Sequence, residues 1–340
     1  MKHQLTVLVL GEVSRAVRGN IFQRQQLQSA PHYFEMSVPN QVIVGEETIF
    51  VSEHETTMYL KGYPPDILVV ETTVDVPNVF DQEKMLVLEN QILEKSYEVL
   101  GKHGGRKEAS ETYSVFAVSG YSGDPDQFFK HSEVIASLLK SEKIKLDPEE
   151  VSYTMAAQIK YADNDTAIID WDGAFLFDAE GDMGATIELL ALANLQLLRY
   201  RILDGQLDER LEDMAHLVKM PKKKFVIRAD KEMEENLRGI LKSRLASIRG
   251  FQSIEREIKL IGDWYFARIY DLASKKFKIG DWRNSVKEKL ESIEGIYNMV
   301  VENFTISRKD RAEWIQIIAF FFLQIGWFIL IILEFFYFTK

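Results

Sequence analysis

The hydrophobic pattern of residues 1–182 alternates between short β-rich runs and longer stretches with a helical period. Runs that are rich in β-branched residues and bounded by Gly, Pro or Asn predict strands over 5–10, 41–52, 66–75 and 112–121. Apolar residues that recur every three or four positions predict helices over 79–100 and 124–142. This mixture predicts an α+β head of the ferredoxin-like type.

The pattern becomes strongly helical over residues 183–220, where 187–217 reads as one continuous helix. Its first half is apolar nearly all round, and a helix without a polar face is normally buried. We therefore expect this helix to pack against the sheet of the head or against a neighbouring subunit.

Residues 221–311 contain two long amphipathic helices, separated by the segment Lys-Ile-Gly-Asp-Trp at 278–282. Apolar residues recur every three or four positions in both helices, and their stripes include Leu241, Leu245, Ile258, Trp282, Leu290 and Tyr297. Such spacing over several heptads is typical of coiled-coil or bundle packing. It predicts a long antiparallel helical hairpin that forms a stalk.

The last part of the chain, residues 312–338, is the most apolar. Twenty residues from Trp314 to Leu333 carry no formal charge, and a helix of that length rises about 30 Å, the thickness of a bilayer's hydrocarbon core. Aromatic residues mark the interfaces of membrane spans. The expected anchor positions are Trp314, Gln324, Trp327, Glu334 and Tyr337.

Charges beside this segment predict its orientation. Arg308, Lys309 and Arg311 precede it, whereas only Lys340 follows it. The positive-inside rule then leaves the head in the cytoplasm, as a tail-anchored, single-pass membrane protein. The apolar run near the N-terminus is too short for a signal peptide. The absence of cysteine excludes disulfides and thiol catalysis, and agrees with a reducing compartment.

Polar residues within the span have two interpretations. At 100° per residue, Gln316 and Glu334 fall on one line of the helix, with Gln324 about 80° away. Gln316 and Glu334 could simply lie at the two interfaces. Alternatively, Gln324 could pack among sister helices, because polar groups inside hydrocarbon normally face other protein. The apolar stripe of the stalk favours such a homo-oligomer.

Charge is distributed unevenly along the chain. Residues 221–340 hold 22 Lys and Arg against 16 Asp and Glu, a net charge of +6, and the other 220 residues hold 19 against 36, a net charge of −17. An acidic head argues against direct nucleic-acid binding, which depends on neutralised phosphates. The basic C-terminal part could meet anionic lipid headgroups.

One acidic cluster, between Asp163 and Asp182, raises the possibility of a metal site. Hard cations require several carboxylate oxygens, and Asp170 and Asp172 would share one face of a strand predicted over 166–177. The same spacing equally suits a solvated sheet edge. The sequence carries none of the common nucleotide-binding, zinc-protease or serine-hydrolase motifs, so we expect no cofactor and no catalytic residue.

Several segments resemble a family of bacterial and archaeal membrane-tethered proteins related to the required-for-meiotic-nuclear-division proteins of eukaryotes. These segments are IIDWDGAFLF, LANLQLLRYRILDGQLDERL, IKLIGDWYFARIYDLASKKF and DWRNSVKEKLESIEGIYNMV, followed by the terminal span. The resemblance covers about residues 168–338. It implies an α/β head, a long helical C-terminal part, one anchor, homo-oligomers and no known enzymatic activity. Within it, Gly262 and Trp264 are expected to serve stalk packing.

These features together predict a membrane-anchored homo-oligomeric scaffold whose cytoplasmic head binds a protein partner. A first alternative is an oligomeric cation channel with the layout of CorA-type magnesium channels, although their Gly-Met-Asn signature and second span are missing here. A second alternative is a metal-dependent enzyme that uses the aspartates between 163 and 182. The expected partners are a second copy of the chain, the lipid bilayer and an unidentified cytoplasmic protein.

Overall fold

The computed structural model describes residues 1–21, 41–51, 54–218 and 264–338, together with positions 242, 245, 248, 249, 251 and 252. The chain divides into two compact units. The first comprises Met1–Gln206 and Arg249–Val286, and the second comprises Leu207–Ile248 and Lys287–Lys340. The first unit contains the acidic head.

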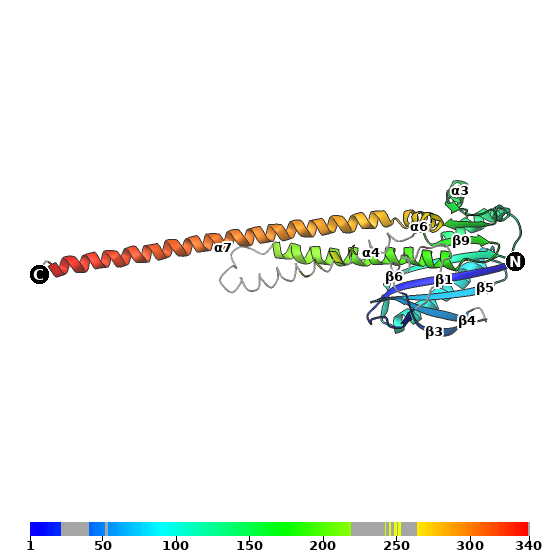
Figure 1. Ribbon diagram of the computed structural model, residues 1–340, viewed down its shortest axis with the longest axis horizontal. Helices are drawn as coiled ribbons and strands as arrows, with labels where there is room; N and C mark the ends of the chain where they lie inside the picture. The colour runs from blue at the N-terminus through cyan, green and yellow to red at the C-terminus, as the bar shows by residue number, and fades with distance from the viewer. Residues whose placement is uncertain are drawn as a thin grey trace. The chain divides into compact units, whose positions relative to one another are not determined.

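The head is built on one mixed sheet, whose described strands are ordered β2-β3-β4-β5-β1-β6-β9-β8-β7 (Figure 1). The strands are β1 (Lys2–Val13), β2 (Asn20–Ile21), β3 (Val42–Val51), β4 (His54–Tyr63), β5 (Ile67–Val76), β6 (Gly105–Ser119), β7 (Gln158–Ile159), β8 (Asp165–Ile169) and β9 (Gly173–Asp178). Neighbouring strands pair antiparallel, except β6 and β9, which are parallel.

A split β-α-β unit lies at the centre of this sheet. Strand β1 pairs antiparallel with both β5 and β6, and helix α1 (Gln82–Lys102) connects β5 to β6 across it. This arrangement is the motif of ferredoxin-like sheets. The predicted α+β fold class is therefore confirmed. Strand β4 was not predicted.

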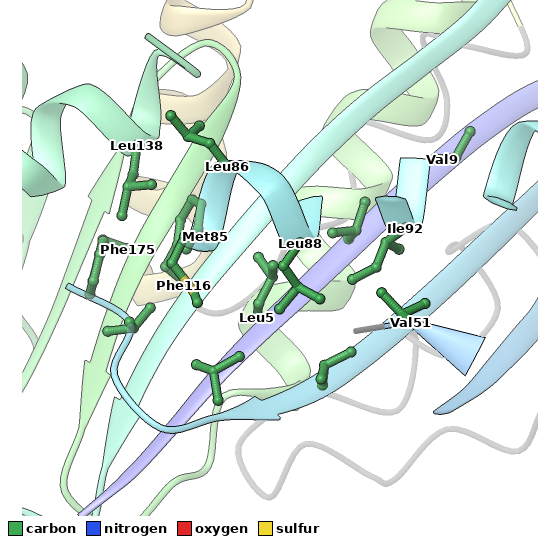
Figure 2. Packing of buried hydrophobic residues seen from close by; sticks show 14 of the residues in the cluster. Leu5, Val9, Val51, Met85, Leu86, Leu88, Ile92, Phe116, Leu138 and Phe175 are labelled. Atoms are coloured by element: carbon green, nitrogen blue, oxygen red, sulfur yellow. The ribbon is translucent and has the colours of Figure 1, made fainter. Parts of the chain in front are cut away.

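One face of the sheet is covered by α1, the 3₁₀ helix η2 (Pro125–His131) and α2 (Ser132–Leu139). Apolar residues from these helices and from β1, β3, β6 and β9 form a single buried cluster (Figure 2). Asp81 caps α1 by accepting a hydrogen bond from the amide of Lys84. Each fully buried Leu or Phe contributes about 1.5–3 kcal/mol, so this cluster fixes the helices on the sheet.

The other face carries α4 (Gly184–Val218) and α6 (Trp264–Lys276). Leu190, Leu195 and Leu198 of α4 are buried, and the Tyr270 hydroxyl of α6 donates to the side chain of Gln196. Strand β1 is buried along nearly its whole length, as expected for a strand with both faces covered. The first half of α4 thus packs on the head.

The second unit contains the end of α4 and most of α7 (Ile279–Phe338), a helix of 60 residues. Asp208 of α4 accepts from Lys289 of α7 at 2.6 Å, and one turn earlier, in the first unit, Asp204 accepts from Ser285 at 2.8 Å. The two helices therefore run in the same direction where they meet. The predicted antiparallel partner of α7 falls mostly on residues outside the described part of the chain.

The residues expected to pack in the stalk are partly described. Leu241, Ile258 and Gly262 lie outside the described residues. Among the others, Leu245 and Trp264 are exposed in the single chain, and Trp282, Leu290 and Tyr297 are half-buried. Their packing role and the division into 1–182, 183–220, 221–311 and 312–338 remain predictions.

Candidate functional site

The most unusual surface of the described chain is the C-terminal part of α7. Ala312–Phe335 is a helical segment of 24 residues, its most apolar stretch of 18 residues has a mean hydropathy of 2.4, and none of the segment is buried. Such a helix is about 36 Å long, enough to cross a bilayer. A core helix of comparable hydropathy would be covered by its own fold. The segment is therefore long and apolar enough to span a membrane.

The polar residues of this segment differ in their depth. Gln324 lies at its midpoint, whereas Glu334 is one residue from its end and Gln316 is four residues from its start. Among the predicted anchor residues, Trp314, Trp327 and Tyr337 are all exposed. The basic residues Arg308, Lys309 and Arg311 lie in the same helix just ahead of Ala312. The order of charged, aromatic and apolar residues is the one that membrane spans show.

The two candidate metal ligands of the head lie in a turn and not in a strand. Strand β8 ends at Ile169 and β9 begins at Gly173, and the amide of Asp170 donates to the carbonyl of Gly173 at 2.9 Å. The predicted strand over 166–177 was therefore wrong. Asp-Trp-Asp-Gly has the composition of a tight turn, with Asp first and Gly last. Its preference for a turn outweighs the preference of the surrounding β-branched residues for a strand.

Protein cations surround the Asp170 carboxylate. Its Oδ1 lies 3.1 Å from Lys276 Nζ and its Oδ2 lies 3.2 Å from Lys140 Nζ. Thr154 Oγ1 donates to Oδ2 at 3.2 Å and the amide of Trp171 donates to Oδ1 at 2.9 Å. Burial alone would raise the pKa of Asp170, but the two ammonium groups outweigh burial and hold the pKa below its ordinary value. Both oxygens are thus already paired.

Asp172 does not complete a metal site with Asp170. The Asp172 side chain reaches the surface, and its incomplete hydration and the neighbouring Asp170 charge raise its pKa. Among the residues that the structure describes, no group of three or more His, Asp or Glu is arranged to hold a metal ion. The Asp170 cluster is an ion-pair network.

This network connects three helices to the β8–β9 turn. Lys140 follows α2, Thr154 belongs to α3 (Pro148–Ala156), and Lys276 is the last residue of α6. Lys276 also lies 4.4 Å above the Tyr153 ring, and the next residue, Phe277, packs edge-on against Tyr113 of β6. The junction between α6 and α7 is therefore fixed to the head. Sequence reasoning missed Lys140 and Lys276, because no spacing links them to Asp170.

A second buried carboxylate, Glu89 of α1, has no cation beside it among its described contacts. It accepts hydrogen bonds from Ser114 Oγ at 2.5 Å and from Ser141 Oγ at 3.5 Å. Burial raises the pKa of Glu89, the Ser114 hydrogen bond opposes this, and the Asp172 charge raises it further. Folding therefore makes the Glu89 carboxylate easier to protonate.

We expect Glu89→Gln to stabilise the head at pH 8, by about 1–3 kcal/mol, and to have little effect at pH 4. An acid with a raised pKa contributes stability below its ordinary pKa, here 4.5, and loses it as the pH rises through the folded value. Glutamine keeps the acceptor for Ser114 and stays neutral. Thermal unfolding at both pH values measures the difference, with exposed Glu98→Gln on the same helix as the control. A less stable variant at pH 8 would contradict this interpretation.

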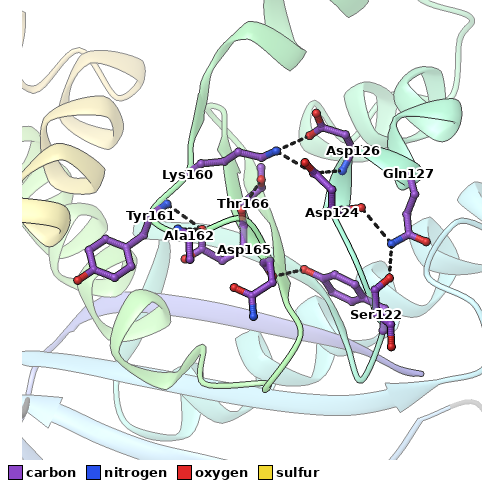
Figure 3. A network of polar contacts seen from close by, with 11 residues as sticks. Ser122, Asp124, Asp126, Gln127, Lys160, Tyr161, Ala162, Asp165 and Thr166 are labelled. Carbon is purple, nitrogen blue, oxygen red and sulfur yellow. Dashed lines mark hydrogen bonds and ion pairs between the residues drawn. The ribbon is translucent and has the colours of Figure 1, made fainter.

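Other aspartates of the acidic cluster serve local structure (Figure 3). The Asp165 carboxylate accepts from the amides of Tyr161 and Ala162 at 2.7 and 3.0 Å, which closes the turn between β7 and β8. Nearby, Lys160 Nζ bridges Asp124 and Asp126 at 2.8 and 2.7 Å. These contacts hold the β7–β8 turn, which contains Tyr161, at the edge of the sheet.

Residues 8–183 match the family described as "Uncharacterized protein MJ0711, N-terminal domain". The chain belongs to this family. Its domain extends from within β1 to the residue before α4, and thus coincides with the sheet and the helices of the first face. Uncharacterized protein MJ0711 of Methanocaldococcus jannaschii is 27% identical over 256 residues, which cover 75% of this chain and 76% of that protein. No solved structure matches the chain.

Proposed function

We propose that this chain is a membrane-anchored homo-oligomeric scaffold whose α+β head binds a protein partner on the cytoplasmic side. The observation that carries the proposal is the apolar segment Ala312–Phe335, none of which is buried. Leaving so much apolar surface in water costs about 25 cal/mol per Å², so the segment needs a hydrophobic environment. A bilayer provides one that matches its length.

The start of α7, the helix that contains this segment, is fixed to the head. Lys276 and Phe277 fix the end of α6 to the β8–β9 turn and to β6, and α7 begins two residues later at Ile279. Val286 and Ile293 of α7 are themselves buried. Helix α7 would thus join the head to the bilayer.

Orientation follows from the basic residues at the start of the span. Arg308, Lys309 and Arg311 favour retention of this end on the cytoplasmic side. The head precedes them in the chain and would share that side.

Homo-oligomerisation is supported by the depth of Gln324. A primary amide at the midpoint of a span loses its water partners, and a sister helix can offer the same amide in return. Residues 168–338 also resemble membrane-tethered relatives of the required-for-meiotic-nuclear-division proteins, and this resemblance likewise implies a homo-oligomer.

The mass of the intact assembly in mild detergent tests this proposal. We expect a defined oligomer for the unmodified chain, and weaker assembly by about threefold to thirtyfold for Gln324→Leu, since an interhelical hydrogen bond contributes about 0.6–2 kcal/mol. Gln316→Leu, near the end of the same segment, is the matched control and should assemble normally. A monodisperse monomer of the unmodified chain would contradict the oligomer.

A further inference from the structure

An exposed aromatic cluster lies on the head where the β7–β8 turn meets the start of α6. The Tyr161 ring is 5.5 Å from that of Trp264 and 5.0 Å from that of Tyr265. Tyr161 is 61% exposed and Trp264 is 58% exposed. Figure 3 shows the Tyr161 ring pointing away from the Lys160 network. We call these three residues the aromatic patch.

The aromatic patch is held in place by contacts that do not use its exposed ring faces. The Tyr161 amide is fixed by Asp165, and Trp264 and Tyr265 are consecutive residues at the first turn of α6. Since Ile269 and Tyr270 of α6 are buried, the backbone that carries Trp264 and Tyr265 is held in place before any partner arrives. A preformed aromatic surface loses little conformational entropy on binding.

Carboxylates lie beside Tyr265 in the aromatic patch. Burial raises the pKa of the Tyr265 phenol, and the carboxylates of Asp165 and Asp178 raise it further because they lie close to it. Asp163 is exposed in the same turn as Tyr161. One basic residue, Arg268, lies over the Trp264 ring at 5.8 Å. The chain thus already places one guanidinium over a ring of this patch.

We propose that the aromatic patch binds an arginine-containing basic segment of a partner protein. Ring faces attract guanidinium groups, and the adjacent carboxylates attract positive charge. Both features therefore favour an arginine side chain as the ligand. The net charge of −17 over residues 1–220 steers such a segment toward the head. This inference rests on the proposed role of the head in binding a protein partner, and it names the surface and the kind of segment.

Binding of fluorescein-labelled octa-arginine to the full-length chain in neutral detergent tests the proposal by fluorescence anisotropy. We expect Trp264→Ala to weaken binding about tenfold and Tyr161→Ala about threefold, because tryptophan is the stronger cation–π partner. The control is Tyr59→Ala, which removes a ring on β4 that is 44% exposed and lies outside the patch. It should change the affinity less than twofold. Each altered ring is at least 44% exposed, so the melting temperatures should stay close to that of the unmodified chain.

Three results would overturn the inference. The first is equal binding of octa-arginine by the Trp264→Ala and Tyr59→Ala variants, which would indicate attraction by net charge alone. The second is octa-glutamate binding as tightly as octa-arginine. The third is a smaller assembly mass in the Trp264→Ala variant, which would assign the patch to contact with a second copy. Membrane sedimentation and the mass of the unmodified chain are measured without the probe, so a failure of the anchor proposal is recognised separately.

Discussion

The double substitution Leu323→Arg and Ile325→Arg is expected to release the chain from membranes. Both residues lie next to Gln324 at the middle of the apolar segment, where each arginine costs about 2.5–3.5 kcal/mol to insert. The pair therefore removes about 5–7 kcal/mol of insertion free energy. Flotation of cell membranes on a density gradient measures the outcome, and the variant should remain with the load fraction or aggregate there.

The matched control places one arginine at the start of the same segment and one just beyond its end, Ala312→Arg and Phe338→Arg. Long basic side chains at the ends of a span reach the headgroup region, so this variant should float with the membranes. If the central and the terminal pairs float equally well, membrane insertion of this segment is refuted.

Replacement of Asp170 by alanine is expected to lower the free energy of unfolding of the head by about 3–5 kcal/mol. The substitution leaves Lys276, whose side chain is only 12% exposed, and Lys140 without their shared counter-ion. It also removes the acceptor for Thr154 and for the Trp171 amide. A loss of this size corresponds to a fall of about 10 °C in melting temperature for a domain of this length.

Asp172→Ala, two residues away in the same turn, is the control for Asp170→Ala. The Asp172 side chain is exposed, so its loss should cost less than about 0.5 kcal/mol.

The pH dependence of Asp170→Ala gives a second check. Since the pKa of Asp170 is lowered on folding, its stabilisation is present above its ordinary pKa of 3.8 and disappears as the pH falls through the folded value. Asp170→Ala should then match the unmodified chain in acid. Equal stability of the unmodified chain, Asp170→Ala and Asp172→Ala at neutral pH would contradict the stabilisation of the head by the Asp170 ion pairs.

The sequence correctly predicted strands whose pattern of apolar residues matches their burial in the folded head. Strands β1, β5 and β6 carry β-branched runs and lie in the middle of the sheet, where both faces are covered. Strand β4 was missed because only Met58 and Leu60 among its alternating positions are large and apolar, and polar residues occupy the positions between them. The Asp-Trp-Asp-Gly turn was missed because the flanking residues gave a continuous β-rich run.

The apolar segment of α7 was found from sequence because its composition alone defines it. The Asp170 network could not be found in the same way. Lys140 follows α2 and Lys276 ends α6. These helices are far apart in the chain, and only their packing on the head brings both ammonium groups to one carboxylate. The aromatic patch likewise depends on α6 reaching the β7–β8 turn. Contacts of this kind have no periodic signal along the chain.

Sedimentation of the unmodified full-length chain after cell breakage, without detergent, tests the role of Ala312–Phe335 most directly. The chain should pellet with the membranes at high speed, resist extraction at alkaline pH and enter the supernatant only when detergent is added. An unaggregated chain in the detergent-free supernatant would show that this segment does not anchor the protein.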